Sequence, residues 1–301
     1  MRRLVKTIIC STAITPFIAA AALSQSRHNA PSVNLEGTIL SVAARREDKK
    51  PDPIRVENIS LYENGVEQKI KNFAFDASPS KIIILVDNSK TLPVAVEALK
   101  KAAMEFAYEI FDGDQLFVIA YDEKPEIIQE WTDDAKKMEV SLGTFRKKGN
   151  PHLFDAIAAA IGNVLLPLMP GTRKTAIVVI GDGLDRGSKR PYDKILNELL
   201  RDNVTVYSLQ IPDRTGGAYR RDQPKAAVTM TQLAEETGGR VFPFEEAQTA
   251  AKFICDELRQ HRYLLSYVPA NTSTYDARKL LLIGDAGLTL RTKAAQPPNV
   301  K

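Results

Sequence analysis

The chain has 301 residues, of which 44% are hydrophobic and 26% charged, and its formal net charge is +4 at pH 7. This length allows one large domain or one domain with a small companion, and the composition is typical of a soluble globular protein. Arg2, Arg3 and Lys6 supply three of the positive charges, so the rest of the chain is close to neutral. No basic stripe that could neutralise a phosphate backbone is present, so nucleic acid is not an expected partner.

The first 24 residues have the build of a secretory signal peptide. Met1–Lys6 is a short basic region, Thr7–Leu23 is mostly apolar, and Ala20 and Ala22, or Ala22 and Ser24, are placed for cleavage. The apolar run has about 17 residues and is interrupted by a proline, whereas a bilayer span needs roughly 20. We therefore expect cleavage and a secreted or periplasmic protein without a membrane span. An uncleaved anchor is the alternative.

Cysteine usage adds little about function. With Cys10 inside the signal segment, the mature chain keeps only Cys255, which excludes an internal disulfide. Cys255 lies in an amphipathic pattern, Ala250–His261, that predicts a helix with the thiol buried as a structural group.

The segment 33–77 is predicted to form short strands. Extended structure is expected at 33–43, 59–62 and 69–75. Between the last two, Asn64-Gly65 predicts a tight hairpin turn, because this dipeptide tolerates positive backbone φ angles.

From Lys81 the pattern changes to alternating strands and helices. Ile82–Val86 is an unbroken apolar run, typical of a strand buried on both faces of a parallel sheet. Further strands are predicted at 115–120, 126–131, 176–180, 203–210 and 240–244, and helices at 93–111, 153–166, 192–201, 226–237 and 250–261. This alternation predicts an α/β domain over 78–261 with a doubly wound, mostly parallel sheet.

Strand patterns return near the end of the chain. They occur at 262–268, 278–283 and 288–291. We expect 262–292 to pack with 33–77 as a small β subdomain, and 293–301 to be a disordered tail.

Polar side chains follow two of the buried strands. Asp87, Ser89 and Thr91 come directly after the first strand, and Asp182 follows the strand at 176–180. In an open doubly wound sheet, ligands bind beyond the carboxyl ends of the strands. Two carboxylates and two hydroxyls suit Mg²⁺ or Mn²⁺, which prefer oxygen ligands, and Mg²⁺ usually retains several waters. An incomplete protein shell leaves a position open for the carboxylate of a protein partner.

On these residues the chain resembles the von Willebrand factor A-related proteins found especially in acidobacterial genomes. Asp87, Ser89 and Thr91 match the metal-ion-dependent adhesion motif D-x-S-x-S, and Asp182 matches the aspartate of the third loop. The similarity covers roughly 33–292 and includes Leu61–Ile70, Gly149–Ile157, Arg262–Tyr267 and Gly287–Arg291. It implies a von Willebrand A-like fold and an adhesion or protein–protein interaction role, in which an Asp or Glu of the partner completes the coordination of the metal.

The chain departs from that family at the second loop. Pro151 stands where the resemblance requires a threonine, and proline has no hydroxyl and no backbone N–H. Lys90 places an ammonium in the first loop, and the imidazole of His152 is a poor ligand for a hard cation. These changes weaken metal binding, so a metal-independent structural or assembly scaffold is an open alternative.

A haloacid dehalogenase-like phosphatase is the enzymatic alternative. Asp87 would be its nucleophile and Asp182 a metal ligand, but Ser89 occupies the position of the general acid and is too weak an acid. The spacing between Asp182 and Asp185 is also one residue short for that family. No G-x-S-x-G elbow or G-x-x-x-x-G-K-[ST] phosphate loop is present. We therefore expect a protein that is not an enzyme.

Overall fold

The computed structural model describes residues 37–47, 53–169, 171–213, 215, 221, 223–270 and 276–298. The proposed signal peptide lies outside the described residues. Within them, no helix has both the length and the apolar character needed to cross a bilayer.

A six-stranded sheet with the order β10-β9-β8-β5-β6-β7 forms the centre of the fold. Its strands are β5 (Lys81–Asp87), β6 (Gln115–Tyr121), β7 (Pro125–Thr132), β8 (Thr175–Gly181), β9 (Thr205–Gln210) and β10 (Val241–Pro243). All pairs are parallel except β7 with β6. The chain builds outward from β5 through β6 and β7, and then continues on the other side through β8. The topological switch point therefore lies beside β5.

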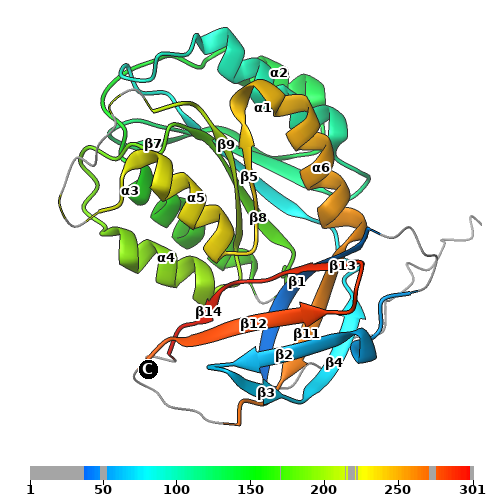
Figure 1. The fold of residues 1–301 in the computed structure, drawn as a ribbon. Helices are drawn as coiled ribbons and strands as arrows, with labels where there is room; N and C mark the ends of the chain where they lie inside the picture. The colour runs from blue at the N-terminus through cyan, green and yellow to red at the C-terminus, as the bar shows by residue number, and fades with distance from the viewer. Residues whose placement is uncertain are drawn as a thin grey trace, which may run out of the picture. The chain divides into compact units, whose positions relative to one another are not determined.

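Helices cover both faces of this sheet (Figure 1). They are α1 (Val96–Glu109), α2 (Ala135–Leu142), α3 (Leu153–Ala159), α4 (Tyr192–Arg201), α5 (Ala226–Glu236) and α6 (Ala247–Gln260). Alternate side chains of β5 enter two separate cores. Ile82 and Ile84 pack with side chains of α1, α2 and α6, whereas Ile83 and Leu85 pack with α3, α4 and α5. The run is apolar throughout because both faces of β5 are covered.

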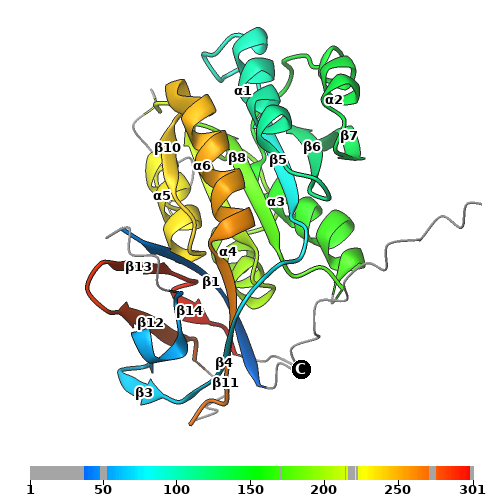
Figure 2. The ribbon, with the colours of Figure 1, turned by 90° about the vertical axis from the view of Figure 1, so that its right-hand side faces the viewer.

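The two flanks of the chain form a β subdomain beside the α/β domain (Figure 2). The first flank supplies β1 (Thr38–Arg46), β2 (Ile59–Glu63), β3 (Val66–Gln68) and β4 (Ile70–Phe75), and the second supplies β11 (Arg262–Tyr267), β12 (Arg278–Gly284), β13 (Leu288–Arg291) and β14 (Ala295–Gln296). They form two antiparallel sheets with the orders β13-β1-β11-β4 and β14-β12-β2-β3. Leu40, Leu61 and Leu265 lie in their shared core. The predicted fold class, a doubly wound α/β sheet with a β subdomain from both flanks, is confirmed.

Three segments differ from the expectation. Helix α2 was not predicted; its N-cap Asp134 accepts hydrogen bonds from the backbone N–H groups of Lys136 and Lys137. The predicted helix at 153–166 is α3 followed by a π-helical stretch over Ala160–Leu165 and a 3-10 turn. Within the expected disordered tail, β14 pairs with β12 because the extended chain there completes the edge of that sheet.

Candidate functional site

The polar loops identified in the sequence meet at the carboxyl edge of the central sheet. Strands β5 and β8 pair in parallel register up to Val86 and Ile180, so Asp87 and Asp182 leave the same edge beside the switch point. Gly181 allows this close approach, because a Cβ on it would lie 3.1 Å from the Cβ of Asp87. The two strand ends that carry Asp87 and Asp182 therefore lie side by side at this edge.

Asp87 is completely buried at this edge. Its Oδ1 accepts a hydrogen bond from the backbone N–H of Ser89 at 2.7 Å, whereas its Oδ2 has no hydrogen-bond partner among the described residues. Burial raises the pKa of Asp87 to about 7, hydrogen bonds from Ser89 lower it in part, and the charge of Asp182 raises it further. The site thus contains a buried carboxylate with one oxygen free to accept a proton, a donor or a cation.

Two hydroxyls connect this carboxylate to the surface. Ser89 is buried and hydrogen-bonds the Asp87 carboxylate. Its Oγ lies 3.1 Å from the Oγ1 of Thr91, which is exposed. Asp87, Ser89 and Thr91 therefore present three oxygen-bearing groups in one continuous path, as the sequence motif predicts.

Asp182 lies at the start of the next loop and is 5% exposed. Its Oδ1 accepts a hydrogen bond from the backbone N–H of Leu184 at 2.9 Å. Burial raises the pKa of Asp182, the charge of Asp213 raises it as well, and Arg186 lowers it. Asp213 follows β9, and no pattern in the sequence indicates that this third acid lies near the site.

The second loop touches both of the others. The backbone N–H of Lys90 donates to the carbonyl of Gly149 at 3.2 Å, and the N–H of Arg186 donates to the carbonyl of Pro151 at 2.7 Å. Pro151 lies in this second loop and offers only a carbonyl oxygen, which already accepts the backbone N–H of Arg186. Backbone hydrogen bonds therefore hold the three loops together without any added group.

The cation that interacts with Asp87 is Lys147 rather than Lys90, which is exposed. Burial lowers the pKa of Lys147, and the charge of Asp87 raises it. Its Nζ donates a hydrogen bond to the carbonyl of Leu92. Sequence reasoning missed Lys147 because it follows α2, the helix that was not predicted.

Tyr121 is a second group that the sequence reasoning missed. It pairs with Asp87 across β6 and β5, and its side chain is completely buried. Its hydroxyl lies 3.0 Å from the point where a Cβ on Gly181 would stand, and has no hydrogen-bond partner within the described part of the chain. The parallel register could have indicated it, since Tyr121 ends the strand next to Asp87.

Asp185 has a structural role instead. Its Oδ1 accepts hydrogen bonds from the backbone N–H of Phe154 at 3.3 Å and from the Oγ of Ser188. It therefore caps the amino end of α3 and ties the loop after β8 to that helix. Both carboxylate oxygens are engaged, since Oδ2 accepts from the N–H of Ser188, so Asp185 does not extend the ligand set.

The donor set fits a hard divalent cation that binds few protein ligands. The unpartnered Oδ2 of Asp87, the two hydroxyls and Asp182 supply the oxygens that Mg²⁺ and Mn²⁺ prefer. The described residues contain no group of three or more His, Cys, Asp and Glu side chains arranged for a metal. A cation here would accordingly depend on hydroxyls and water, with Pro151 removing one hydroxyl.

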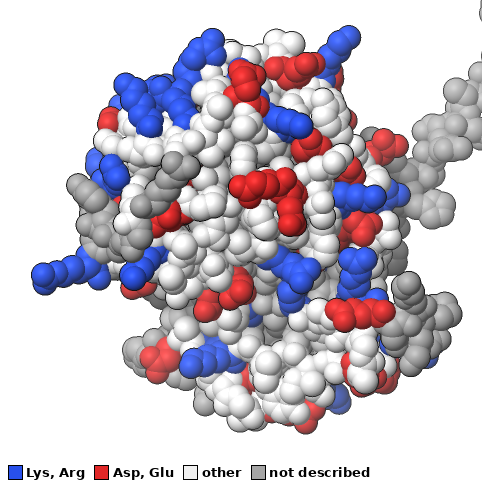
Figure 3. Space-filling view, turned by 45° about the horizontal axis from the view of Figure 1, so that its top comes forward, with Lys and Arg blue, Asp and Glu red and all other residues white. Residues whose placement is uncertain are grey.

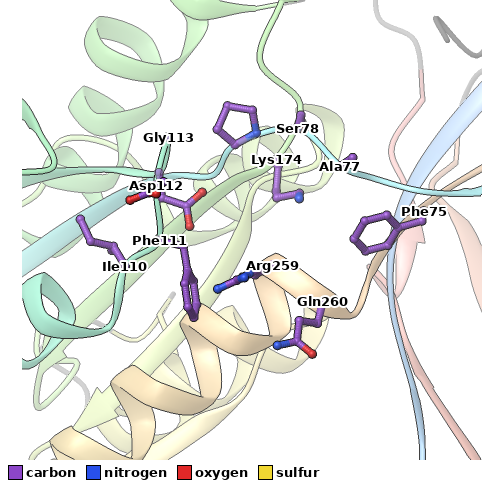
Figure 4. A pocket seen from close by; sticks show the side chains of 12 residues that line it. Phe75, Ala77, Ser78, Ile110, Phe111, Asp112, Gly113, Lys174, Arg259 and Gln260 are labelled. Atoms are coloured by element: carbon purple, nitrogen blue, oxygen red, sulfur yellow. The ribbon is translucent and has the colours of Figure 1, made fainter. Parts of the chain in front are cut away.

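A cavity of about 800 Å³ lies at the opposite end of the sheet (Figure 4). Its lining includes Phe75, Phe111, Lys174, Arg259 and Asp114. The Arg259 guanidinium covers the ring of Phe111 at 3.6 Å. We assign the site to the carboxyl edge and not to this cavity, because the buried Oδ2 of Asp87 and the hydroxyl of Tyr121, which have no hydrogen-bond partner among the described residues, lie at the carboxyl edge.

Part of the chain that carries these loops matches a known protein family. Residues 82–184 match the family model described as the von Willebrand factor type A domain. No match was found among the curated proteins. The matched segment contains β5, the first loop, Pro151 and Asp182.

Solved structures with a similar fold share little sequence with this chain. A von Willebrand factor type A protein from Catenulispora acidiphila is 12% identical, with a TM-score of 0.50 over 88% of this chain and 75% of that chain. An aerotolerance-related membrane protein from Bacteroides fragilis NCTC 9343 is 19% identical, with a TM-score of 0.47 over 60% of this chain and 99% of that chain. Proximal thread matrix protein 1 from the mussel byssus, with a zinc-occupied metal-ion-dependent adhesion motif, is 11% identical, with a TM-score of 0.47 over 65% of this chain and 49% of that chain.

Proposed function

We propose that this chain, whose residues 82–184 match the von Willebrand factor type A domain, is an exported, non-enzymatic protein. It would recognise another protein at the carboxyl edge of its central sheet. Asp87, Ser89, Thr91 and Asp182 would hold a divalent cation, Mg²⁺ or Mn²⁺. Such a cation supplies an open coordination position for an Asp or Glu of the partner.

One observation carries this proposal: Asp87 is completely buried, yet one of its carboxylate oxygens has no hydrogen-bond partner in the described residues. Burying a carboxylate without a partner costs free energy, and such a group is ordinarily stabilised by protonation, by a hydrogen-bond donor or by a metal ion. The hydroxyls of Ser89 and Thr91 lie beside it and lead to the surface. This arrangement favours a cation that a partner can reach.

A metal-independent scaffold is the second candidate function, favoured by Pro151. Its carbonyl binds the backbone N–H of Arg186, and the neighbouring Gly149 carbonyl binds that of Lys90. These bonds fix the three loops without a cation. The domain would then offer its partner a rigid surface, on which basic and acidic side chains are interspersed apart from one basic cluster at the upper left (Figure 3).

A phosphatase is disfavoured by the roles of the acidic residues. Ser89 replaces the general acid, and both oxygens of Asp185 are engaged at the amino end of α3. Incubation of the purified protein with Mg²⁺ and a generic phosphate ester tests this directly. Turnover that Asp87→Asn abolishes would establish an enzyme and overturn this part of the proposal.

Metal binding is tested by thermal denaturation during titration with Mg²⁺ and Mn²⁺. A cation that binds only the folded state raises its stability by about 2.7 kcal/mol at 100 times Kd. We expect the melting temperature to rise with metal in the natural protein, and Asp87→Asn to remove that rise. Asp276→Asn changes an exposed carboxylate elsewhere and should leave the rise intact.

The outcomes separate the two candidate functions. A melting temperature that millimolar metal does not move would leave the scaffold as the function. A rise that persists in Asp87→Asn would place the metal elsewhere. Export is tested independently by sequencing the amino terminus of the mature protein, which should begin after the signal segment.

A further inference from the structure

A second cavity, of about 400 Å³, lies where α6 and β10 meet β1 and β13. Figures 1 and 2 both show the end of α6 beside these two strands. We call it the arginine pocket. Its charged lining residues are Arg45, Arg46, Arg240, Arg291, Glu47 and Glu257.

Three of these arginines gather around one aromatic ring. The guanidinium carbons of Arg45, Arg240 and Arg291 lie 5.9, 5.1 and 5.9 Å from the ring centroid of Phe253. The negative face of an aromatic ring attracts a guanidinium group, so Phe253 holds the three cations within one small region. Phe242 packs against Phe253, with the ring centroids 5.4 Å apart, and supports the ring.

The arginines differ in how far their charges are already matched. Arg291 donates to the carbonyl of Gly239 at 3.0 Å and forms an ion pair with Glu257. Arg45 and Arg240 are exposed and form no ion pair with a carboxylate in the described ranges. One guanidinium group is therefore fixed in place, and two are available to a ligand.

The charge of the pocket is not balanced among the described residues. Glu257 pairs with Arg291, whereas Arg45 and Arg240 have no carboxylate partner in the described ranges, which leaves a surplus of two positive charges. Neighbouring arginines lower the pKa of two lining groups. Burial lowers the pKa of Arg291, the charges of Glu257 and Tyr207 raise it, and those of Arg262 and Arg240 lower it. Burial lowers the pKa of His261, Asp256 raises it, and Arg45 lowers it. A bound anion would relieve this repulsion.

We propose that the arginine pocket binds a doubly charged tetrahedral oxyanion, phosphate or sulfate, either free or as the terminal group of a small ligand. The planar fork of each guanidinium group pairs two N–H donors with two oxygens of such a group. A charge near −2 matches the surplus, whereas a single carboxylate leaves one arginine unmatched. The proposal does not depend on the metal-site residues.

The volume of the pocket bears on the source of the oxyanion. Pockets for small ligands have volumes of about 300 to 1,000 Å³, so this one has room for more than a bare ion. Inorganic phosphate, inorganic sulfate and a sugar phosphate are therefore the three probes. Tighter binding of the sugar phosphate indicates a phosphate ester as ligand, and equal binding indicates the free ion.

Calorimetric titration of the full chain at matched ionic strength, with chloride as the reference, measures each affinity. The double variant Arg45→Gln with Arg240→Gln should bind phosphate at least about tenfold more weakly, because two charge-assisted contacts are lost. Arg240→Lys keeps the positive charge but lacks the planar fork of a guanidinium group. Its affinity for phosphate should therefore lie between those of the natural protein and the double variant. Arg259→Gln is the matched control, because its guanidinium stacks on Phe111 outside the pocket.

Two results would overturn the proposal. One is an affinity for phosphate and sulfate no greater than for chloride in the natural protein. The other is equal phosphate affinity in the double variant and in the Arg259→Gln control. Both substituted arginines are exposed, so far-UV circular dichroism should show folded variants; if they do not fold, the titration of the natural protein with chloride as reference still decides.

Discussion

Asp87 and Lys293 are both buried ionisable residues, but they differ in their hydrogen-bond partners. Lys293 is 4% exposed and donates a hydrogen bond from its Nζ to the carbonyl of Leu200 at 2.7 Å. That carbonyl belongs to the last turn of α4, where a positive charge is favourable. Asp87 has one oxygen held by Ser89 and one without a partner among the described residues. The lysine thus has a structural role within the fold, whereas the aspartate has capacity left for a ligand.

Lys293 should make stability depend on pH in the alkaline range. Burial lowers its pKa to about 7, Asp202 raises it in part, and Arg278 lowers it further. A lysine in the unfolded chain has a pKa of about 10.4. Between about pH 7 and pH 10 the unfolded state therefore binds more protons, so this residue makes stability rise with pH there. Below pH 7 both states are protonated and the cost of burying the charge is fully present.

The variant Lys293→Met tests this dependence. Without the buried charge it should be more stable than the natural protein at about pH 6, by roughly 1–3 kcal/mol, and this advantage should shrink by about pH 9. Urea denaturation of both proteins across this pH range gives the difference between their free energies of unfolding. Other titrating groups contribute equally to both proteins, so their effects cancel in this difference. Parallel stability curves would show that Lys293 is not responsible.

Among the elements, the helical segment after α3 departs most from regular geometry. The π-helical stretch contains Gly162, which is exposed and has nothing within 4 Å of the position of an added Cβ. Gly239, after α5, is the opposite case: a Cβ there would lie 1.8 Å from the carbonyl oxygen of Val206. One glycine therefore lies in open space, and the other permits a close approach of two backbones.

Alanine at each of these glycines should have opposite effects. Gly162→Ala should stabilise the protein by about 0.4–1 kcal/mol, because alanine restricts the unfolded chain and favours helical backbone. Gly239→Ala should destabilise it by more than that, because the backbone of β9 must move. Thermal denaturation of the two variants provides the measurement. A destabilised Gly162→Ala would indicate that the π-helical geometry itself requires glycine.

At the scale of the whole molecule, one buried cluster joins the α/β domain to the β subdomain. Glu257 on α6 accepts a hydrogen bond from the hydroxyl of Tyr207 on β9 at 2.6 Å. It also pairs with Arg262 on β11 at 3.6 Å and with Arg291 on β13. Since α6 is followed directly by β11, the two parts share both covalent and electrostatic connections.

Removal of Glu257 should weaken both parts together. Glu257→Ala leaves two arginines without their carboxylate, which should lower the free energy of unfolding by about 3–5 kcal/mol. Trp131, the single tryptophan, lies on β7 at the far edge of the sheet and reports the α/β domain. In Glu257→Ala, the unfolding transitions followed by Trp131 fluorescence and by far-UV circular dichroism should both move to lower urea concentration. In the exposed control Glu245→Ala, neither transition should move. An unmoved tryptophan transition would show that the two parts unfold separately.

Most of the fold could be predicted from the sequence, because the central strands carry strong patterns. The apolar run at Ile82–Val86 and the alternation of strands with helices determine a doubly wound sheet. Helix α2 could not be predicted in this way, because it is only eight residues long and its N-cap Asp134 is the main local signal. The pairing of β14 with β12 could not be predicted from the sequence either, because a two-residue strand has no periodic pattern.

The candidate site could be predicted only in part. Asp87 and Asp182 follow directly from buried strands, so their shared edge was accessible to sequence reasoning. Lys147 and Asp213 reach the site from long loops, and loop conformation is not encoded in a repeating pattern. Whether the oxygens bind a cation depends on sub-ångström geometry, which residue types alone do not specify; the metal ligands stay a prediction.

The β subdomain combines strands from the two ends of the chain, and this constrains how the protein is made. Ser41 and Arg262, which are hydrogen-bonded across β1 and β11, are 221 residues apart in the sequence. A ribosome must therefore synthesise the chain through β11 before β1 can pair with that strand, and closing so long a loop is slow. A product truncated before β11 would leave β1 with an open edge available for aggregation. Incomplete translation of this gene should accordingly yield insoluble material rather than a shortened functional protein.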